Sequence, residues 1–387
     1  MTWDLDPTNV GTGLPLEGLR VLDLSRVLAG PLCAMIAGDL GADVIKVESP
    51  EGDPVRSLAP PRLGGDATYY LAVNRHRRNV VANLRNERDF ERVAELVKLA
   101  DAVIENYLPS QVLSLGINRL RAANPDCVWV SITPATEGGP LADRPSFDLL
   151  AQARSGLMGV TGEVGAPSKV GAPIADVVTG LYGVVGLLSG LLAKARGRDG
   201  RRFEAPLLES AMSALINQAQ SYLSTNVNPQ RLGNDHPSIT PYGPVTTADG
   251  FLLLAVGTDA QYAKLVEALD DVGLTQKSEW ATNEERVKSR NDLADVLDRI
   301  FVVHDTAYWL RALEHSGVPH APILDVEGAF AQDQISHGDF VGTMSTPSGD
   351  TRAMRTPLLI DGRRPSIRRG PRALGQDTEE IFGSDAN

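Results

Sequence analysis

The stretch "LRVLDLSRVLAGPLCAMIAGDLGADVIKVES" (Leu19–Ser49) decides the fold. Its first seven residues, "LRVLDLS", have the apolar run of a buried strand. "GPLCAMIAGDLG" then predicts a helix that ends at Gly41, and "ADVIKVES" predicts a second strand. A strand, a helix and a strand in succession predict a βαβ unit with two parallel strands.

The same alternation continues as far as residue 133. Strands are predicted at 78–84, 101–107 and 127–133, with helical patterns at 87–100 and 110–124 between them. We therefore predict an α/β fold with a doubly wound, mostly parallel, Rossmann-like sheet. Such sheets bind ligands at the carboxyl ends of their strands. The loops to inspect are 25–31, 48–57 and 105–110.

The composition changes near residue 225. The stretch 224–250 is rich in Asn, Pro, Thr and Gly, which is typical of a linker or an extended crossover. We predict a large α/β domain whose N-terminal part is 1–227, a smaller α+β domain at 228–330, and a C-terminal segment, 331–387, that returns to the large domain.

Composition and charge limit the classes of partner. The 387-residue chain has a formal net charge of −12, which disfavours nucleic acid and an anionic membrane surface as partners. The two cysteines, Cys33 and Cys127, lie in apolar stretches and indicate a reducing compartment. The N-terminal residues lack the pattern of a signal peptide, so we expect a cytoplasmic protein. The apolar run 179–193 contains four glycines and suits a core helix better than a membrane span.

Three common chemistries lack their sequence signals. Glu48 ends the second predicted strand, where a dinucleotide-binding dehydrogenase has an acid for the ribose. The loop after the first strand, however, has only Gly30 of the glycines that the dinucleotide fingerprint requires. A serine hydrolase needs a G-x-S-x-G elbow, which is absent from the sequence. The six histidines show no H-x-x-x-H pair, so no metal site is predicted.

Cations gather near the predicted ligand edge. "NRHRRN" (Asn74–Asn79) contains Arg75 and Arg77, and Arg26 and Lys46 flank the strand-end loops. The pattern is compatible with a solvated basic turn. It is equally compatible with a site for a phosphorylated ligand, because guanidinium groups bind phosphate in a bidentate manner.

One carboxylate stands alone before the apolar helix. Asp176 lies in "VGAPIADVVTG" (Val170–Gly180), after a glycine-proline turn. Asp is a favoured helix cap, because it accepts hydrogen bonds from free backbone N–H groups. The alternative is a nucleophile held at a helix N-terminus, and this stretch alone leaves both interpretations open.

Several stretches together resemble the class III (CaiB/BaiF, formyl-CoA transferase-like) CoA-transferase family. They are "LEGLRVLDLSRVLAGPLCAMIAGDLGADVIKVE", "NRHRRNVVANL", "DAVIENYLP", "SFDLLAQARSGLMGVTG", "VGAPIADVVTG", "GNDHPSITPYGPVTTADGFLLLAVG", "GVPHAPI" and "RALGQDTEEI". They occur in the family's order over nearly the whole chain.

The resemblance implies an acyl-CoA:carboxylate CoA-transferase with Asp176 as its nucleophile. The expected intermediates are an aspartyl mixed anhydride and then an aspartyl-CoA thioester, from which an acceptor acid takes the CoA. CoA thioester is then a substrate, and no cofactor is expected. A helix N-terminus is expected to keep Asp176 ionised at pH 7. The resemblance also implies an interlocked homodimer.

The resemblance assigns further site residues. Val27, Leu28, Asn106 and Tyr107 match CoA contacts, and Arg77 matches a cationic position in the family. We add the neighbouring cations Arg26, Lys46 and Arg75 to the predicted CoA-binding set. Two cationic positions of some relatives are Ser49 and Ser114 here, so the diphosphate must be held differently.

Phe147, Asp148 and His236 are the predicted substrate pocket. Racemases of the family have a histidine where this chain has Phe147, and phenylalanine carries no proton, which favours the transferase. An acyl-CoA racemase or isomerase remains the alternative. A nucleotide-binding dehydrogenase and a non-catalytic CoA-binding protein are weaker ones. Dicarboxylates are the expected acids, with Arg231 as a cation for a second carboxylate.

Overall fold

The structure is a computed structural model that describes residues 3–269, 274 and 277–383. It divides into two compact units, which we describe separately. The first unit takes its described residues from 1–157, 170–227 and 333–387, and the second from 158–169 and 228–332. The segment 158–169, which the sequence analysis placed in the large domain, therefore packs with the second unit.

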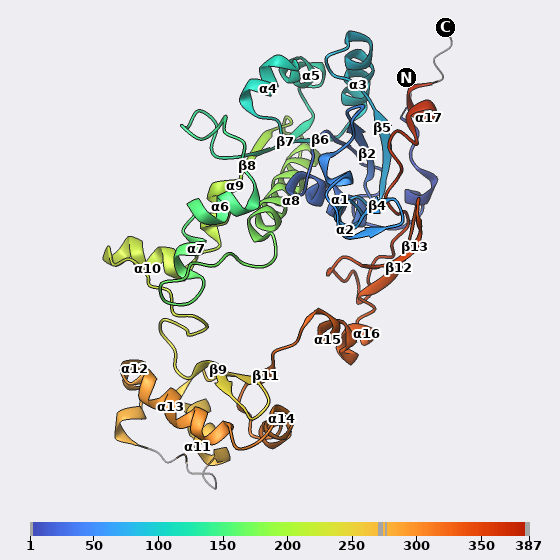
Figure 1. The fold of residues 1–387 in the computed structure, drawn as a ribbon. Helices are drawn as coiled ribbons and strands as arrows, with labels where there is room; N and C mark the ends of the chain where they lie inside the picture. The colour runs from blue at the N-terminus through green and yellow to red at the C-terminus, as the bar shows by residue number, and fades with distance from the viewer. Residues whose placement is uncertain (1–2, 270–273, 275–276, 384–387) are drawn as a thin grey trace. The chain divides into compact units, whose positions relative to one another are not determined.

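A six-stranded parallel sheet forms the centre of the first unit (Figure 1). Its order is β5-β2-β1-β6-β7-β8. The strands are β1 (Arg20–Asp23), β2 (Asp43–Glu48), β5 (Arg77–Val81), β6 (Ala102–Glu105), β7 (Val128–Thr133) and β8 (Arg202–Pro206). The predicted parallel sheet is thus confirmed. The strand order reverses direction between β1 and β6, which is where such sheets open a crevice for ligands.

Helices cover both faces of this sheet (Figure 1). One hydrophobic cluster joins the strands to α3 (Glu87–Leu99), α5 (Ile117–Ala123) and α17 (Thr378–Phe382). The other cluster joins them to α1 (Ala29–Asp39) and α8 (Ile174–Ala195). Successive side chains of a strand point to opposite faces, so Val21 packs in the second cluster and Leu22 in the first.

The remaining elements of the first unit are short. Its two-stranded antiparallel sheets pair β3 with β4 and β12 with β13. The elements are β3 (Arg62–Leu63), β4 (Asp66–Ala67), β12 (Val341–Thr346), β13 (Gly349–Met354), α2 (Thr68–Val73), α4 (Pro109–Ser114), α6 (Asp148–Arg154), α9 (Leu207–Ser213), α10 (Asn217–Thr225) and α16 (Asp333–His337), with 3₁₀ turns at Pro7–Asn9 and Pro54–Arg56. A short helix, α7 (Leu157–Val160), spans the boundary between the units.

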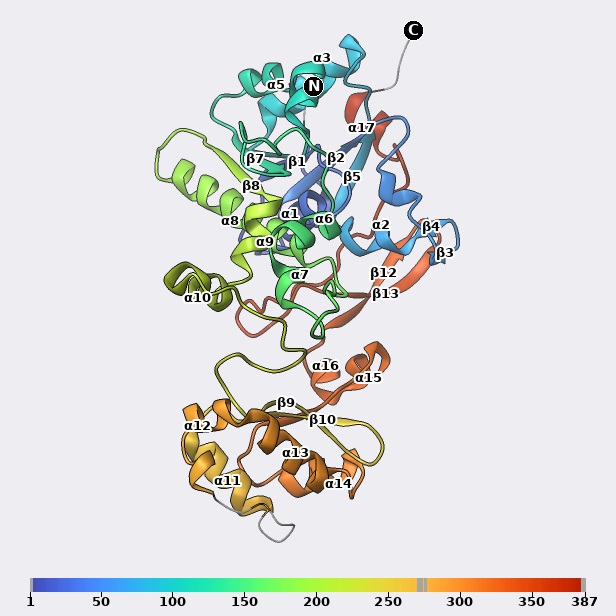
Figure 2. The same ribbon diagram turned by 60° about the vertical axis from the view of Figure 1, so that its left-hand side comes forward.

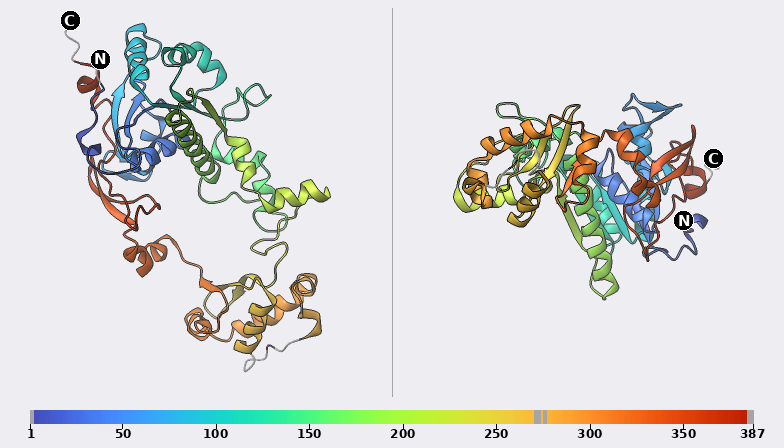
Figure 3. Two further views of the ribbon diagram at one scale, coloured as in Figure 1. Left: turned by 180° about the vertical axis from the view of Figure 1, so that it is seen from behind. Right: turned by 90° about the horizontal axis from the view of Figure 1, so that it is seen from below.

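The C-terminal segment lies along the edge strand β5 of the large sheet (Figure 3). The Asn79 N–H donates to Asp377 Oδ2 at 2.7 Å, and the Gly375 N–H donates to Asn79 Oδ1 at 2.7 Å. These bonds satisfy polar groups at a sheet edge, which would otherwise stay unpaired.

The second unit is a small α+β structure (Figure 2). Its antiparallel sheet has the order β11-β10-β9. The elements are β9 (Tyr242–Thr246), β10 (Phe251–Ala255), β11 (His320–Pro322), α11 (Asp259–Leu269), α12 (Asn283–Lys288), α13 (Arg290–Phe301), α14 (Thr306–Leu313) and α15 (Val326–Ala331), with a 3₁₀ turn at Ser278–Trp280. One hydrophobic cluster with Trp280 and Trp309 fills the space between sheet and helices.

Helix α8 has two different faces. An added Cβ at Gly180 would lie 2.8 Å from the Ala29 carbonyl oxygen, and one at Gly190 would lie 2.4 Å from Val128 Cγ1. Glycine therefore lets α8 approach α1 and the sheet closely. The opposite face exposes Leu181, Tyr182, Val185, Leu188 and Leu192. The expected core helix is thus buried on one side only.

By length and composition alone, α8 is the one described helix that meets the criteria for a membrane span. Its glycine face packs on α1, β7 and β8.

We predict that Gly190→Ala destabilises the first unit by about 1–3 kcal/mol, because the new methyl group overpacks against Val128 and Phe203. Chemical denaturation followed by circular dichroism measures the change. Gly159→Ala in α7 is the control, since its Cβ would meet no atom within 4 Å. Equal stability of the two variants would show that the close approach of α8 carries no constraint.

Candidate active site

The N-terminus of α8 is capped by a residue from another helix. Pro173 stands at the cap position and supplies no side-chain bond. Instead, Asp148 Oδ1 accepts hydrogen bonds from the Ala175 N–H at 2.8 Å and the Asp176 N–H at 3.4 Å. Gln152 Nε2 donates to the other Asp148 oxygen at 2.7 Å. Because Asp148 satisfies the free N–H groups, the cap interpretation of Asp176 is wrong.

The Asp176 carboxyl group is left available. It is the third residue of α8, is partly buried, and accepts no hydrogen bond from the part of the chain that the structure describes. Burial raises the pKa of Asp176 to about 7, and the negative charge of Asp148 adds to this rise. The sequence analysis expected full ionisation at pH 7. Burial beside a like charge disfavours the ionised form, so the pKa of Asp176 lies near neutral pH and not well below it.

Tyr69 is a neighbour that the sequence did not reveal. Burial raises the pKa of this α2 tyrosine to about 12, and the charges of Asp176, Asp148 and Asp53 contribute. Tyr69 therefore lies within electrostatic reach of the candidate nucleophile. Its local sequence, "TYYLAV", looks like any short core helix, so only the tertiary structure places it here.

The loops after β1 and β6 meet across the switch point of the sheet. Asn106 Oδ1 accepts from the Arg26 N–H at 3.0 Å, and Asn106 Nδ2 donates to the Arg26 carbonyl at 2.8 Å. The Arg26 guanidinium lies 5.5 Å from the ring centroid of Tyr107. Three residues of the predicted CoA-binding set are thus brought together. Val27 follows directly, and Leu28, with a buried side chain, is the N-cap residue of α1.

Three other predicted CoA-binding cations are buried and paired. Lys46 Nζ lies 3.0 Å from Asp53 Oδ2. Arg77 Nη1 lies 3.0 Å from Asp23 Oδ2, and Arg75 forms a bidentate ion pair with Asp39.

This burial excludes one of the two interpretations of Asn74–Asn79, that of a solvated basic turn. Arg75 also precedes β5, at the amino end of that strand, whereas ligands bind at carboxyl ends. It stays a prediction that CoA contacts Lys46, Arg75 and Arg77. The geometry gives each a partner inside the protein.

The predicted substrate-pocket residues fall in both units. Phe147 directly precedes α6 and is 61% exposed, next to the capping Asp148. His236 belongs to the second unit, where its ring centroid lies 5.3 Å from that of Tyr242. Arg231, in the same unit, donates to the backbone carbonyls of Glu163 and Gly159.

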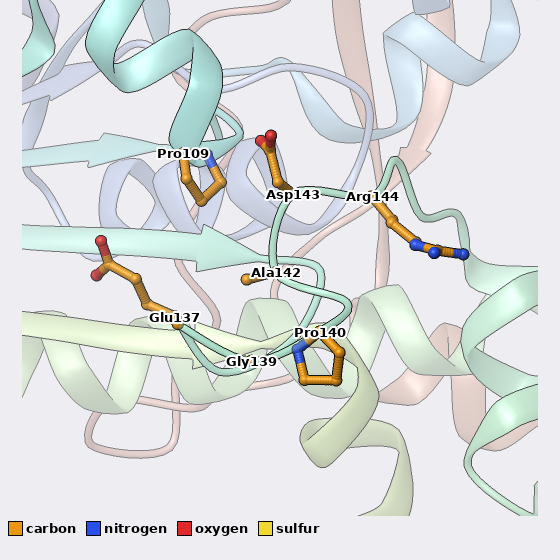
Figure 4. A pocket seen from close by; sticks show the side chains of 8 residues that line it. Pro109, Glu137, Gly139, Pro140, Ala142, Asp143 and Arg144 are labelled. Atoms are coloured by element: carbon orange, nitrogen blue, oxygen red, sulfur yellow. The ribbon is translucent and has the colours of Figure 1, made fainter.

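A cavity of about 510 Å³ lies beside the loop that follows β7 (Figure 4). Figure 4 shows Asp143 pointing toward Pro109 at the start of α4, while Arg144 extends away from it. The Ser110 N–H donates to Asp143 Oδ1 at 2.9 Å and so joins this loop to α4. The cavity is lined by Pro109, Glu137, Gly138, Gly139, Pro140, Ala142, Asp143 and Arg144, so Asp176 lies outside its lining. Within the described residues, His, Cys, Asp and Glu form no group of three suited to a metal ion.

The family model "CoA-transferase family III" matches residues 16–378. Succinyl-CoA:glutarate CoA-transferase of Homo sapiens is 36% identical over 373 residues, which are 95% of this chain and 85% of that protein. Succinate–glutarate CoA-transferase of Agrobacterium fabrum is 36% identical over 379 residues and 95% of each chain. A solved CAIB/BAIF family protein from Brucella suis is similar with a TM-score of 0.85 and 36% identity, over 95% of this chain and 98% of that one.

These matches confirm the resemblance that the sequence motifs carry. They extend over the sheet, the start of α8 and the second unit. The protein belongs to CoA-transferase family III.

Proposed function

We propose that the protein transfers CoA from an acyl-CoA donor to a carboxylic acid, with Asp176 as the nucleophile. The observation that carries this proposal is the Asp176 carboxyl group at the start of α8. Asp148 caps the helix, and the Asp176 oxygens accept no hydrogen bond from the described residues. A partly buried carboxylate without hydrogen-bond donors is more nucleophilic than a solvated one.

The transfer proceeds by four substitutions that balance without an oxidant or a metal. An Asp176 oxygen attacks the thioester carbonyl, the C–S bond breaks, and CoA thiolate leaves an aspartyl mixed anhydride. The thiolate attacks Asp176 Cγ, giving an aspartyl-CoA thioester and the free donor acid. The acceptor carboxylate attacks Cγ and releases the thiolate again. Attack of that thiolate on the acceptor carbonyl frees Asp176 and yields the new acyl-CoA.

We propose dicarboxylic acids as the substrates. The relatives named for succinyl-CoA and glutarate support this class, since each matches 95% of the chain. Phe147 supports transfer over racemisation, because its side chain carries no proton. We further propose that the reaction needs no resident cofactor and takes place in the cytoplasm. The two buried free cysteines are compatible with a reducing compartment.

We also propose a homodimer that uses the exposed face of α8. Residues 181, 185, 188 and 192 repeat at helical spacing and form an apolar stripe. An apolar hollow of about 360 Å³ adjoins it, with Tyr182 and Val185 in its wall. Contiguous apolar surface of this kind is typical of protein interfaces. The family resemblance adds that the two chains interlock.

We predict that Asp176→Asn lowers kcat by at least about 10³-fold, because an amide cannot form the anhydride. Wild-type protein incubated with succinyl-CoA and then treated with hydroxylamine should carry a hydroxamate on Asp176, located by peptide mass spectrometry. The Asn variant, tested in parallel, should carry none. A label on another residue, or an Asn variant with normal turnover, rules out this mechanism.

The second prediction concerns pH. Asp176 must be ionised to attack, and its raised pKa means that kcat/KM falls as pH decreases through about 7. Asp148→Asn removes the neighbouring charge while keeping an oxygen for the cap, so this acidic limb should move down by about one pH unit.

The control is Glu95→Gln, which removes one negative charge on the exposed side of α3. Its profile should coincide with that of the wild type. An unchanged limb in Asp148→Asn would assign the ionisation to a group other than Asp176.

The third prediction concerns assembly. Light scattering should give twice the 41.4 kDa chain mass for the wild type. Val185→Glu places a charge within the apolar stripe and should shift the mass toward the monomer. Leu113→Glu on α4 is the control, because Leu113 is 76% exposed and lies outside the stripe. A dimer that tolerates Val185→Glu would place the interface elsewhere.

A further inference from the structure

The loop after β1 contains a strained residue. Val27 has φ of +72°, in the left-handed region that favours glycine. Valine is branched at Cβ and adopts this backbone conformation with difficulty. Such a conformation persists only where the surrounding structure holds it, and it is concentrated at functional sites.

Side chains from three other segments hold this loop. The Ser25 N–H donates to Asp23 Oδ1 at 2.9 Å, and the Ser25 carbonyl accepts from Lys46 Nζ at 2.8 Å. Asn106 binds both backbone groups of Arg26, as described above. The backbone before Val27 is therefore held by Lys46 in β2 and by Asn106, which follows β6.

Asp53 completes this set of bonds at Val27 itself. The Val27 N–H donates to both Asp53 oxygens, at 3.2 and 3.3 Å. The carboxylate and its partner Lys46 have side chains that are 0% and 1% exposed. Charges are costly to bury, and a buried ion pair contributes little net stability. The catalytic steps proposed above use neither residue.

The loop lies close to the catalytic group. It follows β1 at the switch point of the sheet, where doubly wound folds bind ligands. Val27 packs against the small cluster of Val55, Ala67 and Tyr70, and Tyr69 packs against the same cluster. Tyr69 is the residue whose pKa responds to the charge of Asp176. A change in the backbone conformation of Val27 would therefore shift the packing around Tyr69, beside the proposed nucleophile.

We propose that Asp53 is a positioning residue, which holds Val27 in its left-handed conformation and so presets the β1 loop for acyl-CoA. Lys46 neutralises Asp53 and ties it to Ser25. This inference rests on the proposed function, because it names CoA thioester as the ligand of the loop. A loop that is set before binding loses less conformational entropy when the ligand arrives, and affinity rises accordingly.

The test is to introduce Asp53→Asn into three backgrounds, namely wild type, Val27→Gly and Val27→Ala. In the wild-type background the substitution should weaken CoA binding by about tenfold, measured by calorimetry. KM for succinyl-CoA should rise to a similar extent and kcat should change less. With Gly at position 27 the left-handed conformation costs no strain, so the loss should shrink to about twofold.

Val27→Ala is the matched control. Alanine lacks the branch but retains the Cβ that disfavours positive φ, so the loss caused by Asp53→Asn should stay near tenfold. Equal losses in all three backgrounds would mean that Asp53 does not act through Val27, and would overturn the proposal.

A stability measurement covers the case in which Asp53→Asn fails to fold, since it leaves Lys46 buried without its partner. Val27→Gly should melt roughly 2–4 °C higher than Val27→Ala in an otherwise unchanged chain. Equal melting temperatures of the two variants would show that the backbone at position 27 is not strained, and would overturn the proposal.

The two proposals fail in different ways. A wild-type protein that binds CoA but transfers it to no dicarboxylate contradicts the proposed function and leaves the binding comparison valid. A wild-type protein that binds no CoA contradicts both.

Discussion

The structure of the candidate site depends on the hydrogen bonds from the start of α8 to Asp148. Helix N-termini need acceptors for their free N–H groups, and Pro173 at the cap position of α8 has no side chain that can accept them. Asp148 supplies the acceptor from the first turn of α6. This arrangement fixes α6 against α8 and leaves Asp176 without a capping role. Burial raises the pKa of Asp176, and the Asp148 charge that this arrangement places nearby raises it further.

Carboxylates at the ends of β1, β2 and β6 organise the same edge of the sheet. Asp23 faces Lys46 and Arg77, Glu48 pairs with Arg56, and Glu105 pairs with Arg121. Each carboxylate side chain is at most 1% exposed, so each needs its cation. Arg26 has no carboxylate partner among the described residues, so it is the more accessible cation beside the switch point.

Helix α8 combines two requirements in one sequence. Its glycines allow close packing on the sheet, while its leucines and valines on the opposite side remain exposed. Asp176, the proposed nucleophile, lies in the first turn of the helix, so the packing that fixes α8 also fixes Asp176. A homodimer built on the exposed stripe would bury the apolar surface that a single chain leaves in water.

The sequence by itself determined the parallel α/β sheet, the family and the prominence of Asp176. Periodicity of 2 and 3.6 residues is a local property, and it is visible in Leu19–Ser49 without any contact. The family motifs are likewise continuous stretches of the chain.

Only the tertiary structure decided which carboxylate caps α8, that Arg75 and Arg77 are buried, and that Tyr69 lies near Asp176. Capping, ion pairing and pKa depend on groups far apart in sequence. The local sequence of a charged residue in a turn is the same whether its side chain faces water or a buried carboxylate. Distance, burial and charge are decided when the chain folds, and they determine what Asp176 does at neutral pH.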